Sequence, residues 1–445
     1  MTEQDSQLAK LAAERNAVEV ERAQLTVELD IGDTDSLEAE VRLYSRKFPK
    51  IFSRSKNAEM FDSSGNRYID FFCGAGALNY GHNNDTIKRM VIQYLTQDGI
   101  MHGLDMKTVI RQQFIRKFHD TILKPRGLNY KVQFCGPTGA DAVEAAIKLA
   151  RKVTGRDLII AFTGAYHGMS RGALSVTGGV RARAAGRVHI HNTSFVPFEV
   201  GPEGSFDSVG YIERLLLDAS SGHEKPAAII LEPLQMEGGI YLASSAWLQR
   251  LRDLANRHGI LLICDEIQTG CGRTGPFFCF EGSQIVPDIV TVSKSISGYG
   301  FPMSLLLFKR ELDVWEPGEH TGTFRGNQLA FVSASAALDF WQDADFKARI
   351  DMNGESMRSF GLKIQKKDSS LRVRGQGAVL GIDTGPTDQG RRAARIQEEC
   401  FNRGLIVELC GRDDEVVKIM PPINIDTPTL NEGFAILQAA LEASA

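Results

Sequence analysis

The chain has 445 residues and a formal net charge of −4, with 51 Lys and Arg against 55 Asp and Glu. This balance provides no basic field of the kind that holds nucleic acid, and an apolar share of 43% excludes a disordered chain. The length exceeds that of one ordinary hydrophobic core, so we expect at least two domains.

The seven cysteines predict buried, reduced thiols. Their number is odd, most lie within apolar runs, and no pair has Cys-x-x-Cys spacing. We therefore expect neither a disulfide framework nor a bound metal. The first twenty residues are charged and lack the apolar segment of a signal peptide, and no run of about 18 apolar residues occurs. These features predict a cytoplasmic protein without a membrane span.

The first part of the chain predicts an extension followed by a β-hairpin. Residues 1–35 are rich in Ala, Glu, Gln and Arg, and they form at most a polar helix that either docks on a partner or stays solvated. A short helix is expected after residue 36. Strands over 57–61 and 68–72 flank the turn sequence DSSG, which predicts a hairpin.

Buried strands alternate with amphipathic helices from about residue 105 to residue 335. The strands are predicted over 131–135, 157–162, 227–232, 260–266 and 288–294, with helices over 139–153 and 246–257. Such a pattern indicates a mostly parallel sheet that is covered by helices. The rest of the chain predicts helices over 329–342 and 344–366 and strands over 378–383 and 416–420.

We therefore expect an α/β protein with a large domain and a smaller α+β domain. The expected division is an extension over 1–35, the first part of the small domain over 36–104, the large domain over 105–335, and the second part of the small domain over 336–445. Ligands of open α/β sheets bind at the carboxyl ends of the strands, so the residues at those ends are the candidates for chemistry.

The turn after the strand at 131–135 has the features of an anion site. The segment Gly136-Pro137-Thr138-Gly139-Ala140 leads into a helix that Thr138 can cap, with Asp141 as a capping partner. Backbone N–H groups and the helix dipole at such a start favour a phosphate, although a tight turn with a good cap explains the same residues. No G-x-G-x-x-G follows a predicted strand and no P-loop pattern occurs, so a nucleotide is not favoured.

Other strand ends carry charged or aromatic residues. Asp265 follows an apolar run, and a buried carboxylate there needs a cation or a proton-bearing nitrogen as its partner. Glu232 ends another apolar run and would need a partner for the same reason. Lys294 ends another apolar strand, and desolvation would make it a nucleophile and a Schiff-base candidate. Tyr166 could stack on a flat cofactor. Taken singly, a cap, a salt-bridged lysine and a core aromatic explain these residues equally well.

The combination of these residues describes a site for pyridoxal phosphate. The cofactor needs an amine, a carboxylate that keeps its pyridine nitrogen protonated, an anion cradle and a stacking ring. All four stand at strand ends of the predicted sheet.

At these residues the sequence resembles the class III, fold-type I aminotransferases that use pyridoxal phosphate. The resemblance covers about residues 36–443, and its best-marked segments are LEPLQMEGGIYLASSAWLQRLRDLANRHGILLICDEIQTGCGRTGPFF and PDIVTVSKSISGYG. It implies the fold-type I architecture. It also implies that Lys294 is the lysine linked to the cofactor and that Asp265 is the partner of the ring nitrogen.

The resemblance implies the other residues of the cofactor site as well. Ile267 and Tyr166 would pack on the two ring faces, and Gln268 would approach the ring 3-oxygen. Thr323, in HTGTFRGN, would reach the phosphate of the neighbouring subunit, so a homodimer or a dimer of dimers is expected. The full set of cofactor-binding residues is Thr138, Gly139, Ala140, Tyr166, His167, Glu232, Asp265, Ile267, Gln268, Lys294 and Thr323.

Several stretches are most similar to diaminobutyrate–2-oxoglutarate transaminases, including those of ectoine biosynthesis. These stretches are DFFCGAGALNYGHNN, GIMHGLDM, ILKPRGLNYKVQF, KSISGYGFPM and ELDVWEPGEHTGTFRGN. The similarity implies a ping-pong transfer of the terminal amine from L-2,4-diaminobutyrate to 2-oxoglutarate, which yields L-aspartate 4-semialdehyde and glutamate. The pathway stays open between ectoine, siderophore and peptide-antibiotic routes.

Three positions depart from the family pattern. Met169 stands where 4-aminobutyrate and ornithine transaminases place Arg, and Met236 adds bulk in QMEGG. Lys418 replaces an Arg that pairs with the residue matching Glu237 and binds the acceptor carboxylate. Because lysine lacks the fork of arginine, the acceptor is expected to be held differently. Arg325 is either an extra carboxylate anchor or part of a structural salt bridge, and the expected substrate-binding residues are Glu237, Arg325 and Lys418.

Other functions stay open at this point. The same scaffold could carry an aminomutase, an epimerase or a decarboxylase. A binding or regulatory protein that has lost catalysis is a further alternative, although Lys294 and Asp265 argue against it. Among transaminases, 4-aminobutyrate, ornithine or a longer diamine is the alternative donor.

Overall fold

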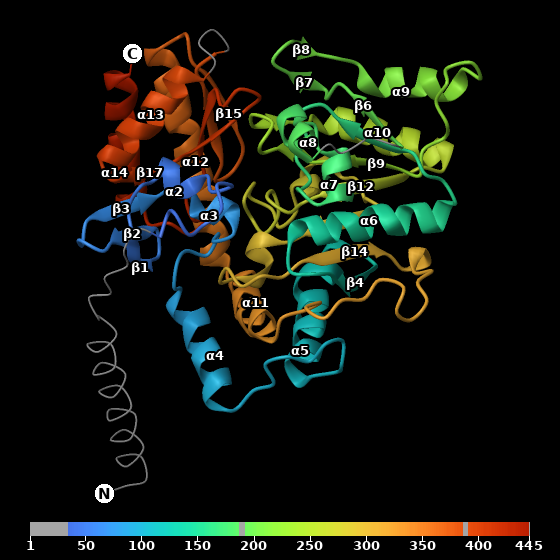
Figure 1. Cartoon of the computed structure of the whole chain (residues 1–445), viewed down its shortest axis with the longest axis horizontal. Helices are drawn as coiled ribbons and strands as arrows, with labels where there is room; N and C mark the ends of the chain where they lie inside the picture. Colours follow the sequence, from blue (N-terminus) through green and yellow to red (C-terminus); the bar gives the residue numbers. More distant parts are fainter. Residues whose placement is uncertain (1–33, 187–191, 386–389, 445) are drawn as a thin grey trace, which may run out of the picture. The chain divides into compact units, whose positions relative to one another are not determined.

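The computed structural model describes residues 34–186, 192–385 and 390–444. The chain forms two compact units, residues 1–49 and residues 50–445. The described part of the first unit holds the short helix α2 (Tyr44–Lys47). Most of the predicted extension, residues 1–33, lies outside the described residues. The second unit contains the sheets and helices that follow (Figure 1).

A seven-stranded sheet lies at the centre of the second unit. Its strand order is β4-β14-β13-β12-β9-β5-β6, and all neighbours are parallel except the two pairs made by β14. The predicted mostly parallel sheet is therefore confirmed. Its strands are β4 (Tyr130–Phe134), β5 (Ile159–Phe162), β6 (Thr193–Val196), β9 (Ala228–Leu231), β12 (Leu261–Asp265), β13 (Ile289–Val292) and β14 (Leu305–Lys309).

The antiparallel strand β14 was not predicted from the sequence. The connection from β13 to β14 holds only a short 3-10 turn over Lys294–Ser297. A parallel neighbour needs a crossover of a dozen or more residues, usually a helix. This connection holds no crossover helix, and the chain turns back so that β14 pairs antiparallel with both β13 and β4.

Helices cover both faces of the central sheet, as the continuous apolar strands predicted. Ile229 and Leu231 of β9 pack in one apolar cluster with residues of α5, α10 and α11. Ala228 and Ile230 of the same strand pack in another cluster with residues of α6. Alternate residues of a strand point to opposite faces, so each face has its own apolar layer. The helices are α5 (Val109–Phe118), α6 (Gly139–Thr154), α10 (Ser245–His258) and α11 (Gln328–Phe340).

Segments from the two ends of the second unit share a sheet. The parallel pairing of β3 with β17 joins residues near 70 to residues near 405, and β2 and β3 form the predicted hairpin. This sheet has the order β1-β2-β3-β17, with β1 (Phe52–Lys56), β2 (Glu59–Asp62), β3 (Arg67–Asp70) and β17 (Leu405–Ile406). The exact domain limits stay a prediction.

A second four-stranded sheet and three helices complete this region. The sheet has the order β15-β16-β19-β18. Its strands are β15 (Arg372–Gly375), β16 (Leu380–Asp383), β18 (Glu408–Cys410) and β19 (Val416–Ile419), and the helices are α12 (Ala344–Lys367), α13 (Arg391–Asn402) and α14 (Thr427–Ala443). The strands and helices predicted from the sequence occur with ends shifted by at most two residues.

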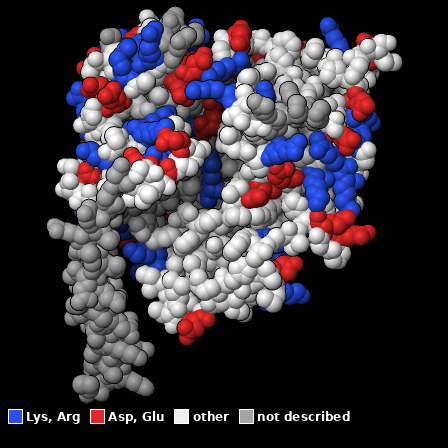
Figure 2. Space-filling model, in the orientation of Figure 1, with Lys and Arg blue, Asp and Glu red and all other residues white. Residues whose placement is uncertain are grey.

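The remaining elements are short or lie at the edges of these layers. They are α3 (Cys73–Gly76), α4 (Asp85–Thr96), α7 (Arg171–Val176), α8 (Val180–Gly186), α9 (Ser208–Leu217), β7 (Val200–Gly201), β8 (Gly204–Ser205), β10 (Leu234–Gln235) and β11 (Tyr241–Leu242). All seven cysteines are buried and free. Positive and negative side chains are interspersed on the face in Figure 2. Over the described ranges, no helix is long and apolar enough to cross a membrane.

Arg273 joins three distant parts of the chain inside the protein. Its guanidinium is fully buried and donates hydrogen bonds to the carbonyls of Ala378 at 2.8 Å and Pro421 at 2.5 Å, and to Asn79 Oδ1 at 2.6 Å. Burial lowers the pKa of Arg273 below its ordinary value. A buried cation of this kind is tolerated because Nη1 and Nη2 have partners, although Nε has none among the described residues.

Replacing Arg273 by methionine is expected to lower the free energy of unfolding by about 3 kcal/mol, because it leaves buried acceptors without donors. Urea unfolding of the cofactor-loaded protein measures the change. Arg358→Met is the matched control, since Arg358 is 68% exposed and pairs with Glu355 on its own helix. That variant should stay within about 0.5 kcal/mol of the wild type. Equal losses in the two variants would contradict the bridging role of Arg273.

Candidate active site

A cavity of about 440 Å³ lies at the carboxyl-end edge of the central sheet. Parallel strands that run in one direction bring their ends to the same edge, so residues far apart in sequence meet there. Of the predicted site residues, those that line the cavity are Thr138, Gly139, Ala140, Tyr166, His167, Glu232, Glu237, Asp265, Ile267, Gln268 and Lys294.

Asp265 is held in place by three hydrogen-bond partners. It ends β12, and only 3% of its surface is exposed. Its Oδ2 lies 2.7 Å from Nδ1 of His167, and its Oδ1 accepts from the Thr291 hydroxyl at 3.0 Å and from the Ile267 N–H at 3.1 Å. These contacts fix the orientation of the carboxylate toward the cavity.

His167 forms an ion pair with Asp265. Its ring is fully buried. Burial opposes the charge of the imidazole, but the hydrogen bond and charge of Asp265, together with Glu232, raise the pKa of His167 above its ordinary value. Nε2 of the ring is buried and has no hydrogen-bond partner among the described residues. The contact with Asp265 therefore favours the charged form of the ring.

Lys294 lies directly after β13, at the start of the 3-10 turn. Its φ of +52° is in the left-handed region, which is strained for a residue with a side chain and is concentrated at functional sites. Burial lowers the pKa of the Lys294 amine below its ordinary value, although the Glu237 carboxylate opposes this shift. A lowered pKa leaves more of the amine neutral and nucleophilic.

The anion cradle predicted at residues 138–140 is the start of α6. The Asp141 carboxylate accepts from the backbone N–H of Thr138 at 2.9 Å and from its hydroxyl at 2.8 Å, as the predicted capping partner does. A Cβ added to Gly139 would come within 2.9 Å of Ile267 Cδ1, so a larger residue there would displace the Ile267 side chain. The first N–H groups of a helix lack intrahelical partners and are available to an anion.

Lys418 lies behind the cavity wall and pairs with two carboxylates. Its Nζ is 2.6 Å from Glu237 Oε1 and 2.9 Å from Glu408 Oε2. The pairing of Lys418 with Glu237 that the resemblance implied therefore exists. Lys418 is fully buried and does not line the cavity.

Two further predicted site residues lie outside the cavity that most of the others line. Thr323 is exposed and Arg325 is partly buried, and neither lines the cavity. Arg325 donates from Nη1 to the His320 carbonyl at 3.2 Å, and its Nε is buried without a partner among the described residues.

Sequence reasoning missed several residues around the site. Thr291 supports Asp265, and Glu408 supports Lys418. The sequence does mark both residues, because each is a polar residue inside an apolar run. Ser170 and Thr269 also line the cavity, and nothing in their sequence context marks them.

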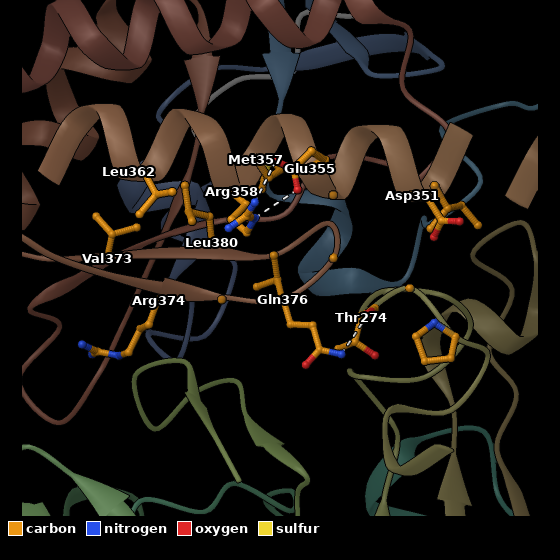
Figure 3. Close-up of a pocket in the computed structure, with 17 residues that line it drawn as sticks. Thr274, Asp351, Glu355, Met357, Arg358, Leu362, Val373, Arg374, Gln376 and Leu380 are labelled. Atoms are coloured by element: carbon orange, nitrogen blue, oxygen red, sulfur yellow. Dashed lines mark hydrogen bonds and ion pairs between the residues drawn. The ribbon is translucent and has the colours of Figure 1, made fainter. Parts of the chain in front are cut away.

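A second cavity, of about 460 Å³, lies between α12 and β15 (Figure 3). None of the predicted site residues lines it. Arg358 and Glu355 pair with each other on α12, and Gln376 donates to the Thr274 carbonyl at 3.2 Å. The predicted chemistry is thus gathered in the first cavity.

Comparison with known proteins supplies the family. The model of the class III aminotransferase family matches residues 43–441. The chain belongs to this family. It is therefore an aminotransferase that uses pyridoxal phosphate, as the resemblance implied.

Relatives and solved structures agree with this assignment. The aminotransferase is 48% identical over 416 residues to a diaminobutyrate–2-oxoglutarate transaminase of Halalkalibacterium halodurans, covering 93% of this chain and 97% of the relative. It is 49% identical over 409 residues to a protein of the same name from Nocardia farcinica, covering 92% and 93%. An S-selective transaminase from Arthrobacter sp. has the same fold, with a TM-score of 0.82 and 22% identity over 92% of this chain and 96% of that chain.

The residues of the cavity fit pyridoxal phosphate. The lysine amine, the carboxylate at the end of β12 and the start of α6 supply three of the groups that the cofactor needs. Oε1 of Gln268 is buried and lacks a partner among the described residues, so an acceptor remains free beside them. Tyr166 is 41% exposed, which leaves its ring accessible from the cavity.

The aminotransferase also buries a second carboxyl group beside Asp265. Glu232 accepts from the N–H groups of Tyr166 at 3.0 Å and Met236 at 3.3 Å. Burial raises the pKa of Glu232 to about 7, His167 opposes this shift, and Asp265 adds to it. The proton on Glu232 therefore comes off near neutral pH.

Ionisation of Glu232 should make the folded protein less stable as the pH rises. The unfolded carboxyl, with an ordinary pKa of 4.5, ionises first, so between about pH 4.5 and pH 7 the unfolded state loses its proton and the folded state keeps it. Glu232→Gln cannot ionise. The free energy of unfolding of this variant should rise relative to the wild type by ~3 kcal/mol across that range.

Urea unfolding of both cofactor-loaded proteins at several pH values measures this difference. Comparison with the wild type at each pH cancels the titration of groups that the two proteins share. A difference that stays constant from pH 4.5 to pH 7.5 would contradict the raised pKa of Glu232.

Proposed function

We propose that this aminotransferase is a diaminobutyrate–2-oxoglutarate transaminase. This proposal rests on the relatives of that name, which align with more than nine-tenths of the chain at 48–49% identity. The donor would give its terminal amine, so that L-2,4-diaminobutyrate becomes L-aspartate 4-semialdehyde and 2-oxoglutarate becomes glutamate. The product would supply an ectoine, siderophore or peptide-antibiotic route.

The roles of the chain's residues follow from the geometry of the cavity. When bound, pyridoxal phosphate supplies an electron sink for the carbon that carries the reacting nitrogen. The amine of Lys294 would take the proton from that carbon and return it. Asp265, which contacts His167 and Thr291, would hold the ring nitrogen of the cofactor in its protonated form. A single cavity serves donor and acceptor in turn, which supports a ping-pong sequence.

The site would be completed by a second copy of the chain. Thr323 is exposed and lies outside its own cavity, which supports the proposal that it reaches the phosphate of a neighbouring subunit. Phe324 beside it is 67% exposed, and Met101 and Met106 are 54% and 60% exposed. Apolar side chains exposed in this number suit a subunit interface, and we propose a homodimer. Arg325 would accompany Thr323 as an anchor for a substrate carboxylate.

A mixture of two variants tests the roles of Lys294 and Thr323 together. Lys294→Ala should abolish transamination, and Thr323→Ala should lower it about tenfold through weaker phosphate binding. In a mixed dimer, one site receives Lys294 from one subunit and Thr323 from the other. Random exchange should therefore restore about one quarter of the wild-type activity.

Activity and the visible absorbance of the bound cofactor provide the measurements. Lys363→Ala, which changes an exposed lysine of α12, is the control and should behave like the wild type. Wild-type turnover by Lys294→Ala would refute its catalytic role. If the activity of the mixture did not exceed the summed activities of the two separate variants, the proposal of a site shared between subunits would be refuted.

A panel of amine donors with 2-oxoglutarate tests the substrate. The aminotransferase should have a kcat/KM for L-2,4-diaminobutyrate at least tenfold above those for 4-aminobutyrate and ornithine, because the relatives that carry the proposal are named for that donor. Formation of glutamate measures the rate.

Incubation with diaminobutyrate alone separates a transaminase from other reactions on this scaffold. A transaminase stops after one half-reaction per site, since no acceptor regenerates the cofactor. Continuous turnover without a 2-oxo acid would instead indicate an aminomutase, an epimerase or a decarboxylase. Preference for 4-aminobutyrate or ornithine would overturn the proposed donor.

A further inference from the structure

A buried lysine pairs with two carboxylates, one of which lines the cavity. Lys418 of β19 stands directly opposite Glu408 of β18 in the sheet register. Its ammonium contacts Glu408 at 2.9 Å and Glu237 at 2.6 Å. The side chain of Lys418 is 0% exposed and that of Glu408 is 6% exposed, whereas that of Glu237 is 29% exposed.

Glu237 alone of these three residues lines the cavity. Its carboxylate therefore lies between the buried ammonium and the space that a substrate occupies. None of the described residues that line the cavity is an arginine. Met169, which directly follows the Tyr-His-Gly segment, is among the lining residues. An incoming substrate thus meets an acidic group on this side and no guanidinium.

The three residues carry one surplus negative charge when all are ionised. Burial opposes the charge of Lys418, but Glu237 and Glu408 raise its pKa well above the ordinary value. Burial likewise opposes the charge of Glu237, but Lys418 and Lys294 lower the pKa of that carboxyl. With one ammonium between two carboxylates, the cluster remains able to bind a further cation.

We propose that Glu237 binds the second, non-reacting ammonium group of a diamino donor. This inference rests on the proposed function and adds the residue that selects the donor. An ammonium on a carboxylate forms a charge-assisted hydrogen bond. A donor such as 4-aminobutyrate has no ammonium at its far end and would lack this contact.

The variant Glu237→Gln isolates this contact. It keeps the shape of the side chain and removes its charge, and Lys418 still has Glu408 as an ionic partner. Its kcat/KM for L-2,4-diaminobutyrate should fall about tenfold to a hundredfold relative to its kcat/KM for 4-aminobutyrate. The ratio of the two donors is the measured quantity, since it cancels any general loss of activity.

The matched variant is Glu408→Gln, which makes the same chemical change on the other partner of Lys418 without altering the cavity wall. It should shift the donor ratio less than Glu237→Gln does. Thermal unfolding and the absorbance of the bound cofactor are recorded for both variants, to show that each folds and fills its cofactor site. Equal shifts in the two variants, or an unchanged ratio in Glu237→Gln, would overturn the inference.

The wild-type donor panel separates this inference from the proposed function. If the wild type prefers diaminobutyrate and Glu237→Gln keeps that preference, only the role of Glu237 fails. If the wild type prefers 4-aminobutyrate, the proposed function fails and takes the inference with it.

Discussion

The site depends on the mutual neutralisation of charged groups that have left water. Ionised side chains are expensive to bury unless each has a partner. Here Asp265 has His167, and Lys418 has two carboxylates. Glu232, whose hydrogen bonds from the described residues come from backbone N–H groups, instead keeps its proton up to neutral pH. The order of strands in the sheet brings these groups together, and their pairing keeps the cavity stable enough to exist.

Part of the site and most of the fold could be predicted from the sequence. Lys294 and Asp265 each follow an apolar strand, and strand ends of a parallel sheet converge, so their meeting follows from the pattern. The helix start at Thr138 was marked by its capping residues. These predictions needed only local signals and one rule of topology.

The rest depended on contacts that sequence does not encode locally. The antiparallel direction of β14 goes with a connection that lacks a crossover helix, and an apolar run by itself does not show which strands it will pair with. Lys418 and Glu237 come from distant segments, and only the folded chain shows that Glu408 is a second partner and that Lys418 is sealed from the cavity. Thr323 and Arg325 are absent from the cavity wall of the single chain, and their roles stay part of the proposal of a second subunit.

The parallel pairing of β3 with β17 has a consequence for the newly made chain. The hairpin of β2 and β3 leaves the ribosome early, but the strand that covers its open edge is made more than 300 residues later. At ordinary rates of synthesis this delay is on the order of tens of seconds. During that time the edge of β3 offers unpaired N–H and C=O groups to any other strand. The edge of β3 is therefore open to incorrect pairing until the residues near 405 have been made.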